Sequence, residues 1–285
     1  MLRAIAMLDS ELDKVSRIAL GAGEIIRKVY DKDFSVAYKS PRDPVTDADT
    51  QANAYIVKAL RDAFPDDGIV AEETKDKSDA LKGGRVWFVD PLDGTKEFIA
   101  KNGEFSVMIG LAIDGEAKLG VVYQVAKDKL YTGIADKGAW LHHEGKKKAL
   151  MVSTRYEPSD LRLVVSRSHR PDSIDKIVRR LGIKNEQKSG SVGLKVGLIA
   201  EQAVDLYIHL SDRSSHWDAC APDAILRGAG GRFMRVDGSS YRYGGEDLRT
   251  DGGIFACNAA AYDAVLPIAR AVARETGFLE RVPPR

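Results

Sequence analysis

The feature that most constrains the fold is a short apolar stretch that ends abruptly in acidic residues. Residues 86–89 are Val-Trp-Phe-Val, and a continuous apolar run of this length is typical of a buried strand. Asp90 and Asp93 follow it, with Pro91 and Gly94 between and beyond them. Proline removes a backbone donor and glycine permits positive φ, so the chain turns tightly here. The fold must therefore place two carboxylates at the mouth of a covered sheet.

This acidic turn predicts a metal site. Two carboxylates held close together repel each other and resist burial, and a hard cation with oxygen ligands relieves both costs. Thr95 is expected to open a helix whose free amides suit a phosphate. A plain polar turn is the alternative, because Asp-Gly is a common turn dipeptide. The combination favours metal-assisted hydrolysis of a phosphoester.

Length and composition limit the class of protein. At 285 residues, 44% hydrophobic and 30% charged, the chain can bury one large core or two moderate ones. A net charge of +1 argues against a basic sheath for duplex nucleic acid. Cys220 and Cys257 form neither a disulfide framework nor a zinc motif, which fits a reducing compartment. We read no membrane-length apolar run and no signal peptide, so we expect a cytoplasmic protein. Peripheral association with the inner membrane is compatible with this expectation.

The predicted elements change in pattern near residue 150. The first part, 1–150, is expected to be α+β and to hold metal and phosphate. Its predicted helices cover 9–30 and 46–64, with a polar loop over 39–44. Its predicted strands cover 68–71 and 86–89, followed by three or four antiparallel strands over 105–141. The second part, 151–285, alternates as α/β, with strands over 161–165, 205–209, 232–236 and 254–256 and helices over 173–181, 192–200, 217–229 and 259–276. We expect the two parts to form one integrated catalytic unit.

Further acids stand at the ends of predicted elements. Glu72 and Glu73 follow a strand, either as solvated surface acids or as additional metal ligands. Asp218 lies at the start of a helix, where a carboxylate can cap the helix, bind metal, or do both. Asp49 lies in a first helical turn, as a plain first-turn acid or as a group that orients a hydroxyl or a water.

Two basic segments are candidates for anion binding. The loop Ser-Arg-Ser-His-Arg at 166–170 follows a strand, and it is either solvated or binds a second anionic group of a substrate. Lys195 is expected on the first turn of a helix entered through Gly-Ser-Val-Gly, an arrangement that also suits phosphate. His142, His143 and His209 have no metal-ligand spacing and are expected to be structural or superficial.

Taken together, these residues resemble the inositol monophosphatase superfamily of Mg²⁺-dependent, lithium-sensitive phosphatases over nearly the whole chain. The motifs in family order are Asp-Pro-Val-Thr-Asp-Ala-Asp at 43–49, Ala-Glu-Glu at 71–73, Asp-Pro-Leu-Asp-Gly-Thr at 90–95, Trp-Asp at 217–218 and Ala-Gly-Gly at 229–231. The stretches Thr-Lys-Glu-Phe-Ile at 95–99, Asn-Gly-Glu-Phe-Ser-Val at 102–107 and Ser-Arg-Ser-His at 166–169 resemble the 3′(2′),5′-bisphosphate nucleotidase branch most.

The resemblance implies a layered α/β/α/β/α sandwich of the sugar phosphatase type and two to three Mg²⁺ ions. By the same resemblance, the implied ligands of the first ion are Glu72, Asp90 and the Leu92 carbonyl, those of the second are Asp90, Asp93 and Asp218, and a third ion lies near Glu72. Asp49, Glu72 and Thr95 are the implied catalytic residues, which position the metal-bound water. The implied substrate-binding residues are Glu72, Leu92, Asp93, Gly94, Thr95, Ser166, Arg167, His169, Lys195 and Asp218, with the Gly94 and Thr95 amides on the phosphate.

The activity that the resemblance implies is hydrolysis of adenosine 3′,5′-bisphosphate to AMP and phosphate, a step in sulfur metabolism. An inositol or sugar phosphate monoesterase is the alternative. A non-catalytic, metal-dependent anion-binding protein is a more distant one. The expected partner is a small phosphate monoester and not a nucleic acid polymer, and a homodimer is compatible with the family.

Overall fold

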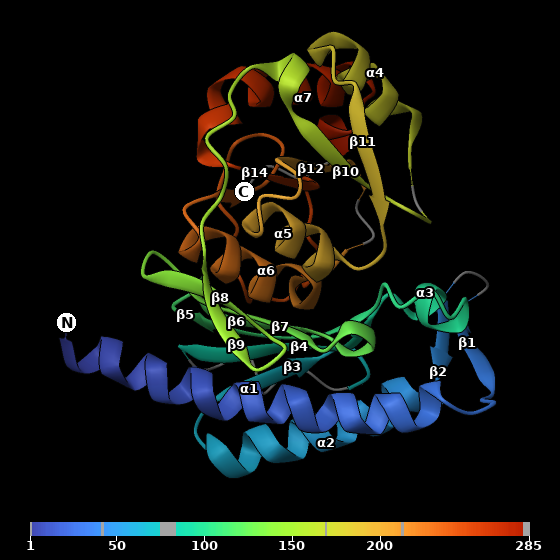
Figure 1. Cartoon of the computed structure of the whole chain (residues 1–285), viewed down its shortest axis with the longest axis vertical. Helices are drawn as coiled ribbons and strands as arrows, with labels where there is room; N and C mark the ends of the chain where they lie inside the picture. The colour runs from blue at the N-terminus through green and yellow to red at the C-terminus, as the bar shows by residue number, and fades with distance from the viewer. Residues whose placement is uncertain (1, 41–42, 75–83, 169, 212–213, 282–285) are drawn as a thin grey trace.

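The computed structural model describes residues 2–40, 43–74, 84–168, 170–211 and 214–281, and these residues form five layers. Helices α1 and α2 cover the outer face of a seven-stranded sheet, α5 and α6 lie between that sheet and a five-stranded sheet, and α4 and α7 cover the far side (Figure 1). The predicted α/β/α/β/α sandwich is confirmed.

The helices and strands have the following bounds. The α-helices are α1 (Leu2–Tyr30), α2 (Asp47–Ala63), α3 (Thr95–Ile99), α4 (Asp172–Leu181), α5 (Val192–Ala200), α6 (His216–Gly228) and α7 (Tyr262–Glu275). Short 3₁₀ helices cover Val125–Lys127, Pro158–Asp160, Ala259–Ala261 and Leu279–Arg281. The strands are β1 (Val36–Ser40), β2 (Asp43–Thr46), β3 (Gly68–Ala71), β4 (Arg85–Asp93), β5 (Ser106–Ile113), β6 (Glu116–Gln124), β7 (Lys129–Ile134), β8 (Gly138–His143), β9 (Lys146–Leu150), β10 (Arg162–Ser166), β11 (Asn185–Ser189), β12 (Leu206–His209), β13 (Arg232–Met234) and β14 (Ile254–Cys257).

Strand β4 is apolar on both faces because both faces of its sheet are covered. The strand order is β3-β4-β5-β6-β7-β8-β9, in which β3 and β4 are parallel and the other neighbours are antiparallel. Trp87 and Val89 pack into the core beneath α1 and α2, whereas Phe88 packs into the core shared with α5 and α6. A continuous apolar run is what a strand between two helical layers requires.

Three glycines let helix α6 lie directly on this sheet. A Cβ atom at Gly110, Gly120 or Gly133, on the neighbouring strands β5, β6 and β7, would lie 2.5, 2.1 and 2.6 Å from backbone atoms of the helix. No side chain fits there without displacing the helix. The contact fixes the first turn of α6, which carries Asp218, above the end of β4.

The five-stranded sheet carries the second half of the chain. Its order is β11-β10-β12-β14-β13, with β10 parallel to β11 and β12, and β14 antiparallel to β12 and β13. The core on its outer side is formed with α4 and α7. Helices α5 and α6 therefore pack apolar residues against both sheets, and their N-termini lie between the two sheets.

Several predicted elements are wrong in place or were missed. Helix α1 begins at Leu2 and not near Asp9, because its helical pattern continues upstream. Of the polar loop predicted over 39–44, the described residues belong to the β1–β2 hairpin. Strand β11 was missed because its sequence, Asn-Glu-Gln-Lys-Ser, is exposed and polar at the sheet edge. Strand β9, rich in lysine, is a second exposed edge of the same kind.

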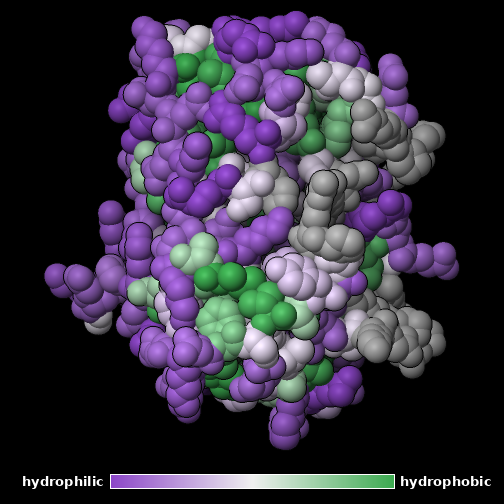
Figure 2. Space-filling model, turned by 90° about the vertical axis from the view of Figure 1, so that its right-hand side faces the viewer, coloured by the Kyte–Doolittle hydropathy of each residue, from purple (hydrophilic) through white to green (hydrophobic). Residues whose placement is uncertain are grey.

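The surface agrees with these exposed polar edges. The face on the side of α3 and β11 is largely hydrophilic, with hydrophobic residues gathered in its lower half and others scattered above them (Figure 2). Among the described residues, no helix has the length and apolar character needed to cross a membrane.

Candidate functional site

The first pair of acids is brought together by the parallel register of β3 and β4. Ala71 pairs with Val89, so the next residues, Glu72 and Asp90, lie side by side where the two strands end. The Glu72 amide donates to the Val89 carbonyl over 3.0 Å, which continues the ladder to that point. Two acidic residues predicted from separate strand ends thus reach one site.

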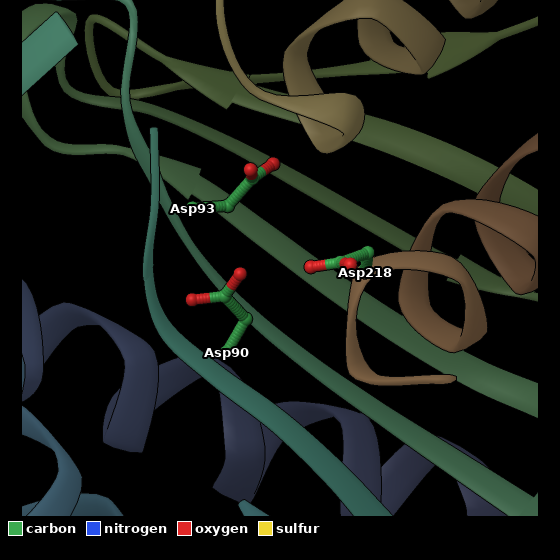
Figure 3. A group of neighbouring side chains, drawn as sticks. All are labelled: Asp90, Asp93 and Asp218. Atoms are coloured by element: carbon green, nitrogen blue, oxygen red, sulfur yellow. The ribbon is translucent and has the colours of Figure 1, made fainter. Parts of the chain in front are cut away.

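Three aspartates form the centre of the site. Ligand oxygens of Asp90, Asp93 and Asp218 all lie within 4.8 Å of one another. Asp90 and Asp93 extend from the end of β4 and Asp218 from the first turn of α6, and the three side chains lie around one space (Figure 3). A bulge in the β4–β5 pairing between Asp90 and Asp93 brings both side chains to the same side.

The environment disfavours the ionised form of these acids. Burial raises the pKa of Asp90 well above its usual range, and the charges of Glu72, Asp93 and Asp218 raise it further. Burial likewise raises the pKa of Asp218, with Asp93 and Glu72 as the next causes. Burial also raises the pKa of Glu72, although the nearby Lys39 ammonium opposes this. Mutual repulsion of this kind marks functional sites that a cation completes.

The cluster lines a cavity of about 820 Å³ between the two sheets. Most predicted site residues line it, namely Glu72, Asp90, Leu92, Asp93, Gly94, Thr95, Ser166, Lys195 and Asp218. Asp49 and Arg167 are not among its lining residues. Four residues that were not predicted as site residues also line the cavity, namely Lys96, Tyr207, Trp217 and Arg249. Lys96 and Trp217 adjoin the predicted residues Thr95 and Asp218, and that adjacency was the available signal. Tyr207 and Arg249 lie outside every motif, so the sequence carried no signal that they share the pocket.

Asp49 lies behind the cluster and is held by two threonines. Its Oδ2 accepts from the Thr46 amide over 2.8 Å and from the Thr46 hydroxyl over 2.6 Å, which completes a capping box at the start of α2. Its Oδ1 accepts from Thr95 Oγ1 over 3.1 Å. Burial raises the pKa of Asp49, and these hydrogen bonds oppose the rise. Asp49 therefore both caps a helix and fixes the Thr95 hydroxyl.

Asp93 is bound by the start of helix α5. Its Oδ2 accepts from Ser191 Oγ over 2.6 Å and from the amides of Val192 and Gly193 over 2.5 and 3.4 Å. Ser191 Oγ also contacts Ser106 Oγ at 2.8 Å. This helix entry was expected to suit a phosphate, whereas the Asp93 carboxylate of the chain itself accepts its hydrogen bonds.

Lys195 is buried behind the same helix entry, with 3% of its surface exposed. Its ammonium donates to the carbonyls of Gly190 and Ser191 over 2.9 and 2.8 Å and lies 5.1 Å from the centre of the Tyr207 ring. Burial lowers the pKa of Lys195 to about 8, and nearby acids including Asp93 oppose that shift.

The basic loop lies outside the cluster. Arg167 donates to both carboxylate oxygens of Glu104, over 2.6 Å each, and Ser168 Oγ donates to Glu97. Ser166 lines the cavity, and His169 lies outside the described residues. The structure therefore engages Arg167 with an acid of the chain, and an anion contact by this loop stays a prediction.

One cation that the sequence analysis missed stands beside the acids. Lys39, on β1, pairs with Glu72 over 2.8 Å and also with Glu73. The only sequence signal was a lysine in the segment predicted as a loop. Its position shows that the hairpin reaches the edge of the site.

The donor set fits a hard divalent cation. Three carboxylates converge, the Leu92 carbonyl lies between two of them in sequence, and Glu72 adjoins Asp90. Carboxylate and carbonyl oxygens are the ligands that Mg²⁺ takes in proteins. The chain thus combines five alternating layers of helices and sheets with a cluster of oxygen ligands at the end of a buried strand. This combination is that of the layered α/β phosphatases.

The comparisons identify the family within that class. The profile of the Inositol monophosphatase family matches residues 8–274, and the chain belongs to this family. It is 37% identical over 236 residues to the 3′(2′),5′-bisphosphate nucleotidase CysQ of Buchnera aphidicola, covering 81% of this chain and 87% of the relative. It is 28% identical over 242 residues to the inositol-1-monophosphatase of Bacillus subtilis, covering 82% and 89%.

Solved structures give the same assignment. The crystal structure of CysQ from Bacteroides thetaiotaomicron superimposes with a TM-score of 0.75 at 30% identity, covering 88% of this chain and 97% of that one. The predicted resemblance to the inositol monophosphatase superfamily is confirmed.

Proposed function

We propose that the protein is a Mg²⁺-dependent 3′(2′),5′-bisphosphate nucleotidase that hydrolyses adenosine 3′,5′-bisphosphate to AMP and phosphate. The observation that carries the proposal is the Asp90–Asp93–Asp218 cluster on a cavity of about 820 Å³, in a chain 37% identical to a CysQ nucleotidase. A cavity of this size is within the range of sites that enclose a whole small ligand.

The carboxylates have the metal-binding roles in this proposal. Glu72, Asp90 and the Leu92 carbonyl would hold one ion, Asp90, Asp93 and Asp218 would hold another, and a third would bind near Glu72. When bound, Mg²⁺ supplies a water of lowered pKa, polarises the phosphoryl oxygens and neutralises the leaving alkoxide. The amides of Gly94 and Thr95 bind the phosphate, and in-line attack by water releases it.

Thr95 and Asp49 orient the attacking water. The Thr95 hydroxyl donates its hydrogen to Asp49 Oδ1, so its oxygen remains an acceptor. An acceptor at this position would hold one O–H of the water, while Glu72 would contribute a second contact from the end of the neighbouring strand β3. Asp49 in turn is kept in place by its capping box with Thr46.

An inositol or sugar phosphate monoesterase is the second candidate, which the similarity to the B. subtilis inositol-1-monophosphatase supports. The same metal centre serves both reactions, so the two differ in the groups that bind the rest of the substrate. For the nucleotide, Ser166, Arg167, His169 and Lys195 are the proposed contacts of the second phosphate and the nucleoside.

We also propose the setting of the enzyme. It acts in the cytoplasm, within sulfur metabolism, on a small-molecule substrate, and lithium inhibits it. Residues 1–150 and 151–285 work as one catalytic unit, since Asp90 and Asp218 come from different parts of it. A homodimer is compatible with this arrangement.

The decisive experiment measures phosphate release from adenosine 3′,5′-bisphosphate and inositol 1-phosphate side by side, with Mg²⁺, and with and without lithium. A strong nucleotide preference supports the proposal. A preference for inositol phosphate overturns the substrate assignment but retains the metal centre. Absence of Mg²⁺-dependent release from both substrates would favour a non-catalytic anion-binding protein.

A further inference from the structure

Tyr207, the second residue of strand β12, directs its side chain toward the middle layer of the fold. Its neighbours Leu206 and Ile208 pack into the core formed with α4 and α7, whereas Tyr207 packs into the core shared with α5 and α6. Successive side chains of a strand point to opposite faces of the sheet, so the register of β12 fixes this direction. The phenol therefore reaches the cavity from the five-stranded sheet.

The Tyr207 ring is fixed by its packing. The ring of His209 stacks on it, with 6.1 Å between the ring centres and 19° between the ring planes. The Lys195 ammonium lies 5.1 Å from the centre of the same ring. With 1% of its surface exposed, Tyr207 has little freedom to turn, so the position of its hydroxyl is set by the fold.

The hydroxyl of Tyr207 has no hydrogen-bond partner in the part of the chain that the structure describes. Buried tyrosine hydroxyls usually find a partner. Other buried tyrosines of this chain do so: Tyr131 donates to Glu201, Tyr241 to the Gly253 carbonyl and Tyr243 to Asp223. Because Tyr207 lines the cavity, the partner that its hydroxyl lacks is expected to be an atom of a bound ligand.

The surroundings of Tyr207 keep its hydroxyl protonated. Burial raises the pKa of the phenol well above its usual range, and the charges of Asp93 and Asp218 raise it further. At neutral pH the group is therefore a hydrogen-bond donor. Since the effect of a charge falls with distance, the hydroxyl lies on the side of the cavity where Asp93 and Asp218 converge.

Tyr207 and the residues that orient the attacking water come from different sheets. Glu72 and Thr95 follow strands of the seven-stranded sheet, whereas Tyr207 belongs to the five-stranded sheet, across the middle layer (Figure 1). In an in-line displacement the attacking and leaving oxygens lie roughly opposite each other. The leaving oxygen is therefore expected on the side of Tyr207. Lys195, a proposed contact of the rest of the substrate, lies on that side too.

We propose that the Tyr207 hydroxyl is a catalytic group that donates a hydrogen bond to the leaving sugar oxygen of the substrate. This inference rests on the proposed phosphatase function. Water forms the new P–O bond, the P–O bond to the sugar breaks, and one proton of the water ends on the sugar oxygen. Tyr207 keeps its own proton throughout. Its hydrogen bond strengthens as negative charge develops on the leaving oxygen, so it favours the transition state over the bound substrate.

The test measures Mg²⁺-dependent hydrolysis of three esters by the wild type and by Tyr207→Phe, which removes only the hydroxyl. Adenosine 3′,5′-bisphosphate and adenosine 3′-phosphate release an alkoxide, whereas p-nitrophenyl phosphate releases a resonance-stabilised phenolate that needs little assistance. We expect kcat to fall about 10- to 100-fold for both nucleotides, as for the loss of a hydrogen bond to a charged group, with KM nearly unchanged. For p-nitrophenyl phosphate the loss should be less than about threefold.

Two further measurements need no substrate. Because the Tyr207 hydroxyl has no partner among the described residues, Tyr207→Phe should melt at the temperature of the wild type or above it, and should bind Mn²⁺ in titration calorimetry with unchanged affinity. Tyr131→Phe is the matched control, because it removes a buried hydroxyl that is paired with Glu201 and lies away from the cavity. This control should melt at a lower temperature and keep its kcat.

Four results would overturn the proposal. Unchanged nucleotide rates would exclude a contact with the leaving oxygen, and equal losses on all three esters would mean that the hydroxyl acts on the transferred phosphate. A loss confined to the bisphosphate would place the hydroxyl on the second phosphate. A lower melting temperature or weaker Mn²⁺ binding in Tyr207→Phe would show a structural role.

The comparison also separates this inference from the substrate assignment. If the wild type prefers inositol 1-phosphate, that ester, which likewise releases an alkoxide, takes the place of the nucleotides, and the same loss is expected in Tyr207→Phe. If the wild type hydrolyses none of these esters, the proposed phosphatase function fails, and the role of Tyr207 fails with it. A wild type that is active and a Tyr207→Phe variant that equals it would contradict the role of Tyr207 alone.

Discussion

Thr95 Oγ1 donates a hydrogen bond to Asp49 Oδ1 over 3.1 Å, which joins the first turns of two helices that are 46 residues apart. The same hydroxyl lies 3.3 Å from the Leu92 carbonyl, one of the proposed metal ligands. A single side chain therefore connects the buried acid to the edge of the metal site.

Replacement of Thr95 by valine should impair the chemical step more than binding. Thr95→Val keeps the shape but removes the oxygen that orients the water, and positioned proton-transfer groups contribute about 10²- to 10⁴-fold to rate. We expect kcat to fall by about 100-fold or more with a small change in KM. Thr132→Val, at a buried threonine of β7 away from the cavity, is the matched control. Equal losses in both variants would show a packing effect.

Asp90→Asn should abolish turnover and leave the fold intact. The substitution removes the charge shared by the two proposed metal sites and changes the side-chain volume little. Metal stabilisation of the transition state contributes several kcal/mol, so the rate should fall by at least about 100-fold. Because burial and neighbouring acids raise the pKa of Asp90, the metal-free variant should melt at the same temperature as the wild type or above it. Near-normal phosphate release by the folded variant would contradict the metal-centre assignment.

Metal removal should lower thermal stability. An ion that binds only the folded chain stabilises it by about 2.7 kcal/mol at 100 times its dissociation constant. Thermal melts with EDTA and with Mg²⁺ should therefore differ for the wild type. Asp218→Asn, which removes a central carboxylate of the cluster, should reduce that difference. An equal Mg²⁺ shift in the variant would mean that the ion binds elsewhere.

Asp223 should make stability depend on pH. Burial raises the pKa of Asp223 from 3.8 to about 7, although Arg227 and a hydrogen bond from Tyr243 oppose the shift. A raised pKa means that the folded state binds the proton more tightly. The stabilisation is complete below pH 4 and is lost as the pH rises from about 4 to 7.

Asp223→Asn keeps an acceptor for the Tyr243 hydroxyl and removes the titration. The free energy of unfolding of the wild type, relative to this variant, should fall between pH 4 and 7 and then level off. Urea unfolding of both proteins across that range measures the difference. A relative stability that rises with pH would contradict the assignment of this acid as buried and titrating.

The sequence predicted the acidic centre well because its members follow strong local patterns. Asp90 and Asp93 end an apolar strand, and Asp49 and Asp218 were expected at helix starts. Asp218 was expected as a possible cap, but Ser215 is the N-cap of α6 and Asp218 is the third residue of the helix. Such patterns depend on neighbours in the chain. The roles implied for these residues stay predictions until the variants above are measured.

Contacts between distant segments were not predictable in the same way. The pairing of Glu104 with Arg167 and with Gly190 joins three segments by tertiary packing, and no local pattern encodes it. Strand β11 is held by one neighbour at an exposed edge, so its polar sequence carries no apolar alternation. Lys39 was missed for a similar reason, since only the fold brings it to Glu72.

The three glycines beneath helix α6 have a consequence for how the protein matures. Asp218 reaches Asp90 and Asp93 only when the helix is seated on strands that were completed some 85 residues earlier in the chain. A nascent or truncated chain that ends before α6 contains the strand acids but lacks the third arm of the cluster. Under the proposed metal binding, a complete ion site therefore requires both halves of the chain to have assembled.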